Sequence, residues 1–379
     1  MIRSKLPNIN TSIFTVMTEV ATKHNAINLS QGFPDFNPPE ELIKLIEKYM
    51  RKGFNQYAPM QGLMSLREKI ALKTQDLYGQ SFDPDTEITI TSGATEAIFS
   101  SISAFVQEGD EVIVFEPAYD SYAPIIRING GNPIYVAVKL PDYKIDWEEV
   151  NKMVNARTRM IIINTPHNPS GSILSADGME KLNKLVAGTN IIVLSDEVYE
   201  HLVFDGMAHE SALKYPNLKE RAIVVSSFGK TYNATGWKIG YCIATAHITK
   251  EIRKIHQFDV FAVNTPIQHA ISDFIDNKDV YLEVKEFYQQ KRDEFLDLIK
   301  GSRFTGTPSQ GTYFQMLSYK DISTEKDTVF ANRLIEEHGI ATVPVSAFYH
   351  DAIDTKVLRF CFAKTSETLK KAAEILHKI

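Results

Sequence analysis

The stretch AIVVSSFGKTYNATGWKIGY, residues 222–241, contains a lysine shortly after a run of apolar residues. The run from Ala222 to Ser227 has the composition of a strand that is buried on both faces of a parallel sheet, and Lys230 follows it. A free lysine titrates near 10.4, so keeping it neutral at pH 7 costs about 4 kcal/mol. A covalent imine with an aldehyde removes this cost. The stretch therefore predicts a lysine that reacts with a carbonyl compound.

Two familiar lysine motifs do not explain this stretch. The nucleotide-binding P-loop needs a glycine five residues before its Gly-Lys pair, and this chain has Val224 at that position. Ser227 and Lys230 have the Ser-x-x-Lys spacing of β-lactamases, but the companion motifs Lys-Thr-Gly and Ser-Asp-Asn do not occur in the sequence. Phosphate-loop chemistry and acyl-serine chemistry are both disfavoured.

Short apolar runs alternate with helical patterns on both sides of this stretch. Several runs are almost entirely Val and Ile, as expected for strands whose two faces are covered by helices. Helices are expected at 95–107, after a Gly-Ala-Thr start, and at 175–186, which begins with a serine that can cap it. We predict an α/β fold with a seven-stranded, mostly parallel sheet between helices, its strands at 87–91, 111–115, 133–138, 159–164, 190–195, 222–227 and 238–244.

The sequence pattern changes after about residue 278. A long charged helical pattern covers 278–300, and we expect strands at 311–317 and 357–362 and a final amphipathic helix at 365–378. The first forty residues are rich in proline around positions 32–39, which favours an extended arm over a helix or strand. We predict a large domain at 41–277 and a small α+β domain made of 278–379 and the arm at 1–40.

Polar residues after other predicted strands could share a site with Lys230. Asp196 closes one strand, and Tyr199 lies about one helical turn further on. Asn168 follows another strand, and the Gly-Ala-Thr at 93–95 precedes a helix, where free N–H groups favour phosphate. Each residue also has an ordinary interpretation, such as a helix cap, a surface salt bridge or an Asn-Pro turn. Together they are what pyridoxal phosphate (PLP) needs beside a lysine.

The stretch from Ser226 to Tyr241 resembles the Schiff-base lysine region of the class I and II aminotransferases, which are PLP-dependent transferases of fold type I. Asn168, Asp196 and Tyr199 have that family's order and spacing, and the resemblance covers nearly the whole chain. Further stretches look like the kynurenine aminotransferase branch, at 30–36, 55–57 and 117–122, and like bacterial methionine aminotransferases, at 164–170, 195–201 and 226–232.

The resemblance implies a role for each residue around the cofactor ring. Lys230 would form the Schiff base and carry the proton between the substrate Cα and the cofactor C4′. Asp196 would pair with the pyridinium nitrogen, and Tyr199 and Asn168 would hydrogen-bond the ring oxygen. Tyr119 would stack on the ring, because an aromatic face fits there better than an aliphatic one.

The resemblance also implies a site for each anionic group. The phosphate would be held by the amides of Ala94 and Thr95, the Ser227 hydroxyl and Lys238, with Tyr57 supplied by a second subunit. Many relatives have arginine where this chain has Lys238, and lysine gives a point charge in place of a planar fork. Arg359 would clamp the substrate α-carboxylate, helped by Asn168 and the Gly32 backbone.

The substrate side chain would lie among aromatic residues, namely Phe14, Phe33, Tyr119 and Phe261. The segment HQFDVFAVN at 256–264, expected to come from the neighbouring subunit, has no arginine that could receive a second carboxylate. We therefore predict transamination of methionine, phenylalanine and tyrosine, with kynurenine and glutamine as further donors, to a 2-oxo acid by a ping-pong mechanism. A homodimer is the expected active unit, because Tyr57 and Phe261 would act across the subunit boundary.

The composition disfavours several other classes of protein. The 379 residues are 44% hydrophobic and 23% charged with a net charge of -6, so we expect a globular protein without nucleic-acid or membrane partners. Cys242 and Cys361 lie in apolar runs, which predicts buried thiols, and we expect no metal site. The sequence contains no apolar run of 18 residues and no recognisable signal peptide, which predicts a cytoplasmic location.

Two alternative functions stay open. A PLP-dependent β-lyase that cleaves the C–S bond of cysteine conjugates would share Lys230, Asp196 and Tyr199. It would release pyruvate and ammonia without an added 2-oxo acid. A transcription regulator that uses such a domain as a ligand sensor would need a DNA-binding module and a basic surface, which the net negative charge disfavours.

Overall fold

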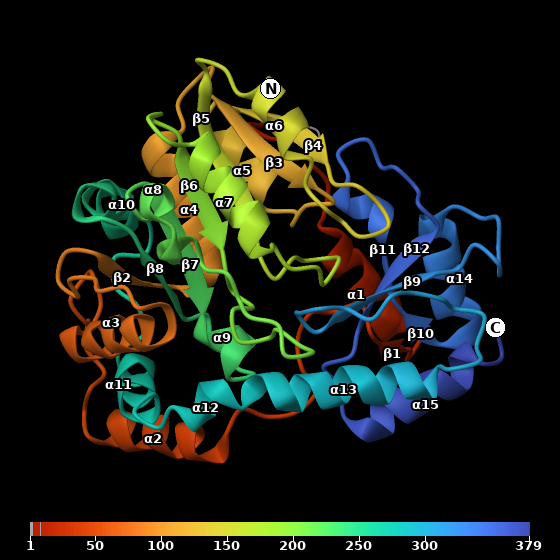
Figure 1. Cartoon of the computed structure of the whole chain (residues 1–379). Helices are drawn as coiled ribbons and strands as arrows, with labels where there is room; N and C mark the ends of the chain where they lie inside the picture. The colour runs from red at the N-terminus through yellow and green to blue at the C-terminus, as the bar shows by residue number, and fades with distance from the viewer. Residues whose placement is uncertain (1–2, 8) are drawn as a thin grey trace.

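The computed structural model describes residues 3–7 and 9–379. A seven-stranded sheet forms the centre of the molecule (Figure 1). The strands lie in the order β2-β8-β7-β6-β5-β3-β4. β8 is antiparallel to both neighbours, and the other strands pair in parallel, which confirms the predicted mostly parallel sheet. The strands are β2 (Ile88–Thr91), β3 (Glu111–Glu116), β4 (Asn132–Ala137), β5 (Thr158–Asn164), β6 (Ile192–Asp196), β7 (Ala222–Ser227) and β8 (Gly240–Ile243).

Two of these strands differ from the predicted limits in a way that affects the site. β6 includes Asp196 as its last residue, so the sheet itself fixes the backbone of this acid. β8 begins only at Gly240. Lys238 has a φ of 50°, and a residue in this left-handed conformation cannot be part of a strand. The predicted strand at 238–244 is therefore too long by two residues at its start and one at its end.

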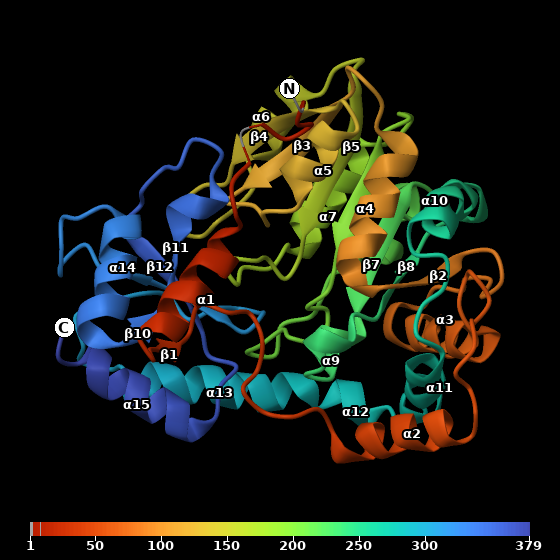
Figure 2. The same cartoon turned by 180° about the vertical axis from the view of Figure 1, so that it is seen from behind.

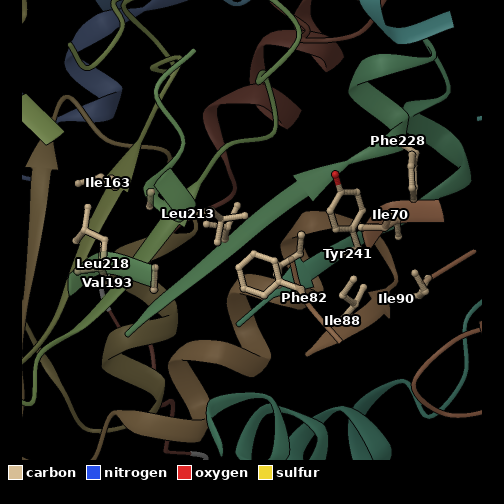
Figure 3. Packing of buried hydrophobic residues seen from close by; sticks show 14 of the residues in the cluster. Ile70, Phe82, Ile88, Ile90, Ile163, Val193, Leu213, Leu218, Phe228 and Tyr241 are labelled. Atoms are coloured by element: carbon tan, nitrogen blue, oxygen red, sulfur yellow. The ribbon is translucent and has the colours of Figure 1, made fainter. Parts of the chain in front are cut away.

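Helices cover both faces of the sheet (Figures 1 and 2). In β5, Met160 and Ile162 belong to one core, whereas Ile161 and Ile163 belong to another, because successive side chains of a strand point to opposite faces. Figure 3 shows part of the second of these cores, including Ile163 and Val193. The covering helices are α4 (Gly93–Phe105), α5 (Tyr122–Ile128) and α10 (Ala246–Asp259) on the first face, and α2 (Glu40–Arg51), α3 (Met64–Tyr78), α6 (Trp147–Met153), α7 (Ala176–Leu185) and α11 (Thr265–Phe274) on the second.

A separate core joins the two ends of the chain. It combines α1 (Ile13–Lys23) with α13 (Val284–Leu298), α14 (Asp327–His338) and α15 (Ser366–Leu376) around an antiparallel sheet of order β11-β12-β9. β1 (Ile27–Asn28) also pairs in parallel with β10 (Ile340–Ala341). The strands of the small sheet are β9 (Phe314–Ser318), β11 (Val343–Pro344) and β12 (Val357–Cys361). The division of the chain at residues 41 and 277 stays a prediction.

Two helical segments differ from the predictions. The first forty residues are not all extended, because α1 buries Met17 and Ala21 on one face against this core; residues 29–39 have no helix or strand. The helix predicted at 278–300 is divided into α12 (Asp279–Leu282) and α13. Glu283 separates them, because its ψ of -7° departs from the helical value near -42°. Two further short helices are α8 (Pro216–Lys219) and α9 (Phe228–Thr231).

Both cysteines are buried and unpaired, as predicted. Burial raises the pKa of the Cys242 thiol to about 12, so this thiol stays protonated and unreactive. Across residues 3–7 and 9–379, every helix is too short or too polar to cross a lipid bilayer.

Candidate active site

A cavity of about 270 Å³ lies where β5, β6 and β7 end, beside the first turn of α4. The carboxyl ends of parallel strands meet at one edge of a sheet, so residues distant in sequence gather there. Most of the predicted site residues line this cavity: Gly32, Phe33, Ala94, Thr95, Tyr119, Asn168, Asp196, Tyr199, Ser227, Lys230 and Lys238. Phe14, Tyr57, Phe261 and Arg359 are not among its lining residues.

The amine of Lys230 lies in the cavity, partly buried and hydrogen-bonded to neutral oxygens. Its Nζ donates to the Tyr313 hydroxyl at 3.0 Å and to the Gly32 carbonyl at 3.2 Å. Within the described residues, no carboxylate comes within 4.0 Å of it. Loss of water contact lowers the pKa of Lys230 to about 8. The amine can therefore both accept and release a proton near neutral pH.

Asp196 is a buried carboxylate whose neighbours are also neutral. The Tyr122 hydroxyl donates to its Oδ2 at 2.6 Å, and the Val198 amide donates to its Oδ1 at 3.3 Å. The side chain of Asn164 donates to the Asp196 carbonyl at 2.9 Å, which holds the end of β6 against β5. Burial raises the pKa of Asp196 to about 6. A positive charge beside this carboxylate would favour its ionised form.

The first turn of α4 and Lys238 make one part of the cavity positive. The N–H groups of this turn, including those of Ala94 and Thr95, have no partners inside the helix. The Nζ of Lys238 donates to the Thr95 hydroxyl at 3.3 Å. Gly93 has a φ of 73°, a backbone conformation that suits glycine, and it lies next to Lys238. Free N–H groups next to a cation are suited to a phosphate or another anion.

Arg359 is a fully buried cation on β12, and it reaches the cavity through Asn168. Its two Nη atoms donate to Asn168 Oδ1 and to the Ser30 carbonyl, each at 2.8 Å. The guanidinium also packs on the Phe314 ring at 3.9 Å and the Phe14 ring at 4.9 Å. In the described part of the chain, its Nε lacks a hydrogen-bond partner. Burial lowers the pKa of Arg359 to about 10, so it remains charged and is suited to receive an anion.

Tyr57 and Phe261 lie together on the surface, outside the cavity of their own chain. Their rings make an edge-to-face contact with centroids 5.5 Å apart, and Tyr57 is 84% exposed. Phe258 nearby in sequence is 87% exposed. Phe33 lines the cavity but is also partly exposed, and the Lys364 amine lies 5.1 Å from its ring centre. The role of Tyr57 and Phe261 in a neighbouring subunit stays a prediction.

Sequence reasoning gave no role to several residues that complete the site. Tyr122 contacts Asp196, Tyr313 contacts Lys230, and the rings of Phe314 and Phe348 flank Arg359. Tyr122 had a detectable signal, because it follows Tyr119 by three residues in a segment that enters a helix. The other three come from the C-terminal third of the chain, and no sequence pattern pointed their side chains toward the cavity.

Comparison with known proteins agrees with this geometry. A family model described as aminotransferase class I and II matches residues 24–376. The chain belongs to this family. The aminotransferase is 48% identical to methionine aminotransferase of Escherichia coli (strain K12), and the match covers 100% of this chain and 98% of that protein. It is 36% identical to kynurenine–oxoglutarate transaminase of Dictyostelium discoideum, with 97% and 94% covered.

Solved structures confirm the fold. One solved structure is that of Escherichia coli YbdL, whose structure and reactivity identified a methionine aminotransferase function. It superimposes on this chain with a TM-score of 0.98 at 48% identity, and the match covers 100% of both chains. A second solved structure, N-succinyldiaminopimelate aminotransferase from Mycobacterium tuberculosis, has a TM-score of 0.95 at 34% identity, again with 100% of both chains covered. The predicted fold type I architecture and the predicted aminotransferase activity are thus confirmed.

Proposed function

We propose that this aminotransferase uses PLP to transfer the amino group of an apolar or aromatic L-amino acid to a 2-oxo acid, in a ping-pong order. The expected donors are methionine, phenylalanine and tyrosine, with kynurenine and glutamine as further candidates. One observation carries the proposal. The amine of Lys230 shares a cavity with the buried carboxylate of Asp196 and with an anion site formed by Lys238 and the first turn of α4.

The residues around the cavity fit PLP by their chemistry. Burial raises the pKa of Asp196 to about 6, so a pyridinium nitrogen would supply the positive charge that this carboxylate lacks. The amides of Ala94 and Thr95, together with Lys238 and the Ser227 hydroxyl, would hold the phosphate. An acid and an anion site in one cavity match the two ends of this cofactor.

Three further residues would hold the cofactor ring. Tyr119 would stack on one face of the ring, and Tyr199 and Asn168 would hydrogen-bond its oxygen. Burial raises the pKa of both tyrosines above the ordinary value, so their hydroxyls stay protonated and can donate. Asn168 is held in place from two sides, because its backbone N–H donates to Asn164 Oδ1 at 2.8 Å and its side-chain Oδ1 accepts from Arg359 at 2.8 Å.

Lys230 and Arg359 would act on the substrate. When bound, PLP supplies an aldehyde that takes up the amino group and a ring that accepts the electron pair left on the substrate Cα. Lys230 would hold the proton that leaves Cα, which suits a lysine whose pKa is lowered to about 8. Arg359 would bind the α-carboxylate and so orient the Cα–H bond toward the amine.

The preference for apolar and aromatic donors is supported by what surrounds the cavity. Phe33 and Tyr119 line it, and Phe14 packs on Arg359. The segment 256–264 contains no arginine for a second carboxylate. The relatives named above include a methionine aminotransferase and a kynurenine transaminase.

We further propose that the active unit is a homodimer. Tyr57, Phe258 and Phe261 are large aromatic residues at the surface, with 84%, 87% and 48% of their areas exposed. A second copy of the chain would cover them and would bring Tyr57 to the phosphate site and Phe261 to the substrate pocket of its partner. The cytoplasmic location also stays a prediction.

A panel of amino donors tests the substrate proposal. The purified enzyme is loaded with PLP, and the rate of amino transfer from each L-amino acid to several 2-oxo acids is measured. We expect the highest kcat/KM for methionine or an aromatic amino acid. A higher kcat/KM for aspartate than for these donors would overturn the proposed specificity.

A related assay distinguishes transamination from the alternative β-lyase activity. Cysteine conjugates are incubated with the PLP-loaded enzyme, with and without a 2-oxo acid. We expect transfer only when the 2-oxo acid is present. Release of pyruvate and ammonia in its absence, at rates above those of transamination, would instead support the β-lyase.

A further inference from the structure

Tyr313 makes the shorter of the two hydrogen bonds to the Lys230 amine. The Nζ of Lys230 donates to the Tyr313 hydroxyl at 3.0 Å and to the Gly32 carbonyl at 3.2 Å. The Tyr313 hydroxyl in turn donates its own hydrogen to the same Gly32 carbonyl. The three groups form a closed triangle in which two N–H bonds of the amine are used as donors. The remaining position on the nitrogen is left for the proton that it gains or loses.

The Tyr313 ring has little freedom to move. It is fully buried just before β9, and it packs edge-to-face on Tyr199 at 5.2 Å and on Phe314 at 4.9 Å. The Tyr313 carbonyl accepts from the Phe362 amide at 3.0 Å, which fixes the backbone. Gly32 can approach closely because a Cβ at that residue would lie 2.9 Å from the Phe314 ring. The hydroxyl of Tyr313 is therefore held at a fixed point beside the amine.

The phenol can hold the amine but cannot take over its proton. Burial raises the pKa of Tyr313 well above its ordinary value, so the hydroxyl stays protonated. A lysine side chain has four rotatable bonds, and an amine that must accept a proton from one carbon needs a defined position. Besides Tyr313, the charged or titratable groups around this amine are Asp196, Tyr199, Lys238, Arg359 and Cys361.

We propose that Tyr313 is a positioning residue that holds the Lys230 amine in place for proton transfer at the substrate Cα. The inference rests on the proposed function of Lys230. Tyr313 lies just before β9, whereas Lys230 follows a strand of the large sheet. Their hydrogen bond connects the amine to the strand paired with β12, which carries Arg359.

The first test compares Tyr313→Phe with Tyr288→Phe in the PLP-loaded enzyme. Tyr288 is an equally buried tyrosine whose hydroxyl donates to Asn233 and whose ring lies 5.7 Å from that of Tyr313. We expect Tyr313→Phe to lower kcat about 10²-fold and to change KM for the amino donor by less than about threefold. The kinetic isotope effect of deuterium at the substrate Cα should be larger for Tyr313→Phe than for wild type or Tyr288→Phe.

The second test measures the apparent pKa of the Lys230 amine and needs no catalytic turnover. Lys230 of the cofactor-free chain is labelled by reductive methylation at a series of pH values, and mass spectrometry of its peptide gives the apparent pKa. The Tyr313 hydroxyl accepts a hydrogen bond from the charged amine, so Tyr313→Phe should lower this pKa, whereas Tyr288→Phe should leave it unchanged.

The outcomes separate the inference from the proposed function. If Tyr313→Phe matches Tyr288→Phe in kcat, isotope effect and labelling, Tyr313 is only a core residue and the inference is wrong. If wild type fails to transaminate, the proposed function is wrong, and the labelling still decides whether Tyr313 holds the amine. A lower kcat with an unchanged isotope effect and an unchanged pKa would also contradict the inference.

Discussion

Lys73 and Lys230 are two enclosed lysines of the same enzyme, and their partners differ in charge. Lys73, in α3, donates to the Glu200 carboxylate at 2.7 Å and to the Tyr241 hydroxyl at 3.0 Å. Among the described residues, Lys230 donates only to a phenol and a backbone carbonyl. A carboxylate favours the charged form of a buried amine, whereas neutral oxygens compensate the loss of water only in part. The comparison separates a lysine that holds the fold from a lysine that can react.

The polar groups around Lys73 form a network of hydrogen bonds that converge on Glu200. Glu200 also accepts hydrogen bonds from Tyr78 at 2.5 Å and from Ser226 at 2.6 Å. Burial alone would raise the pKa of Glu200, but Lys73 holds this pKa well below its usual range. The network therefore keeps Glu200 ionised, and it fixes Ser226, the residue before Ser227 of the cavity.

Replacement of Lys230 should have the largest effect. We expect Lys230→Ala to lower transamination at least about 10⁴-fold, the upper end of what a proton-transfer group contributes. Binding of PLP through its phosphate should persist, because Ala94, Thr95 and Lys238 are unchanged. Amino transfer and equilibrium dialysis of PLP measure the two effects. Wild-type rates in this variant would show that Lys230 is not the reacting lysine.

Replacement of Lys73 should affect stability more than chemistry. Lys73→Ala leaves the Glu200 carboxylate buried without its cation, and we expect a loss of about 3–5 kcal/mol in the free energy of unfolding. Urea unfolding measures this loss. The double variant Lys73→Met, Glu200→Gln is the control. It removes both charges and keeps an acceptor for the Tyr78 and Ser226 hydroxyls, so it should restore much of the stability. A loss below about 1 kcal/mol for Lys73→Ala would mean that the ion pair does not support the fold.

The fold was predictable because its signals are local. Runs such as Ala222 to Ser227 predict strands buried on both faces, and the structure has a strand with these limits. The site was predictable only in part. The resemblance brought Lys230, Asp196 and Lys238 together, and the cavity contains all three.

The remaining contacts depend on packing between distant segments. Tyr313 lies 83 positions from Lys230, and its ring is oriented by Tyr199 and Phe314. In the sequence, nothing distinguishes Lys73 from other lysines in helical segments, and only the fold shows that it is buried against Glu200. No periodicity or spacing in one sequence reports such contacts.

The pH dependence of stability gives the smallest predicted effect and tests the comparison directly. In the cofactor-free enzyme, loss of water contact lowers the pKa of Lys230 from 10.5 to about 8. Between these values the unfolded chain holds a proton that the folded chain has released, so stability must rise with pH. Lys230→Ala removes this contribution. From pH 7.5 to 10.5, the stability of wild type relative to the variant should therefore rise by about 1–3 kcal/mol. Urea unfolding of both proteins at several pH values measures the difference, and other titrating groups cancel in it. A constant difference would mean that Lys230 keeps an ordinary pKa and that its neutral partners do not make it the reactive lysine.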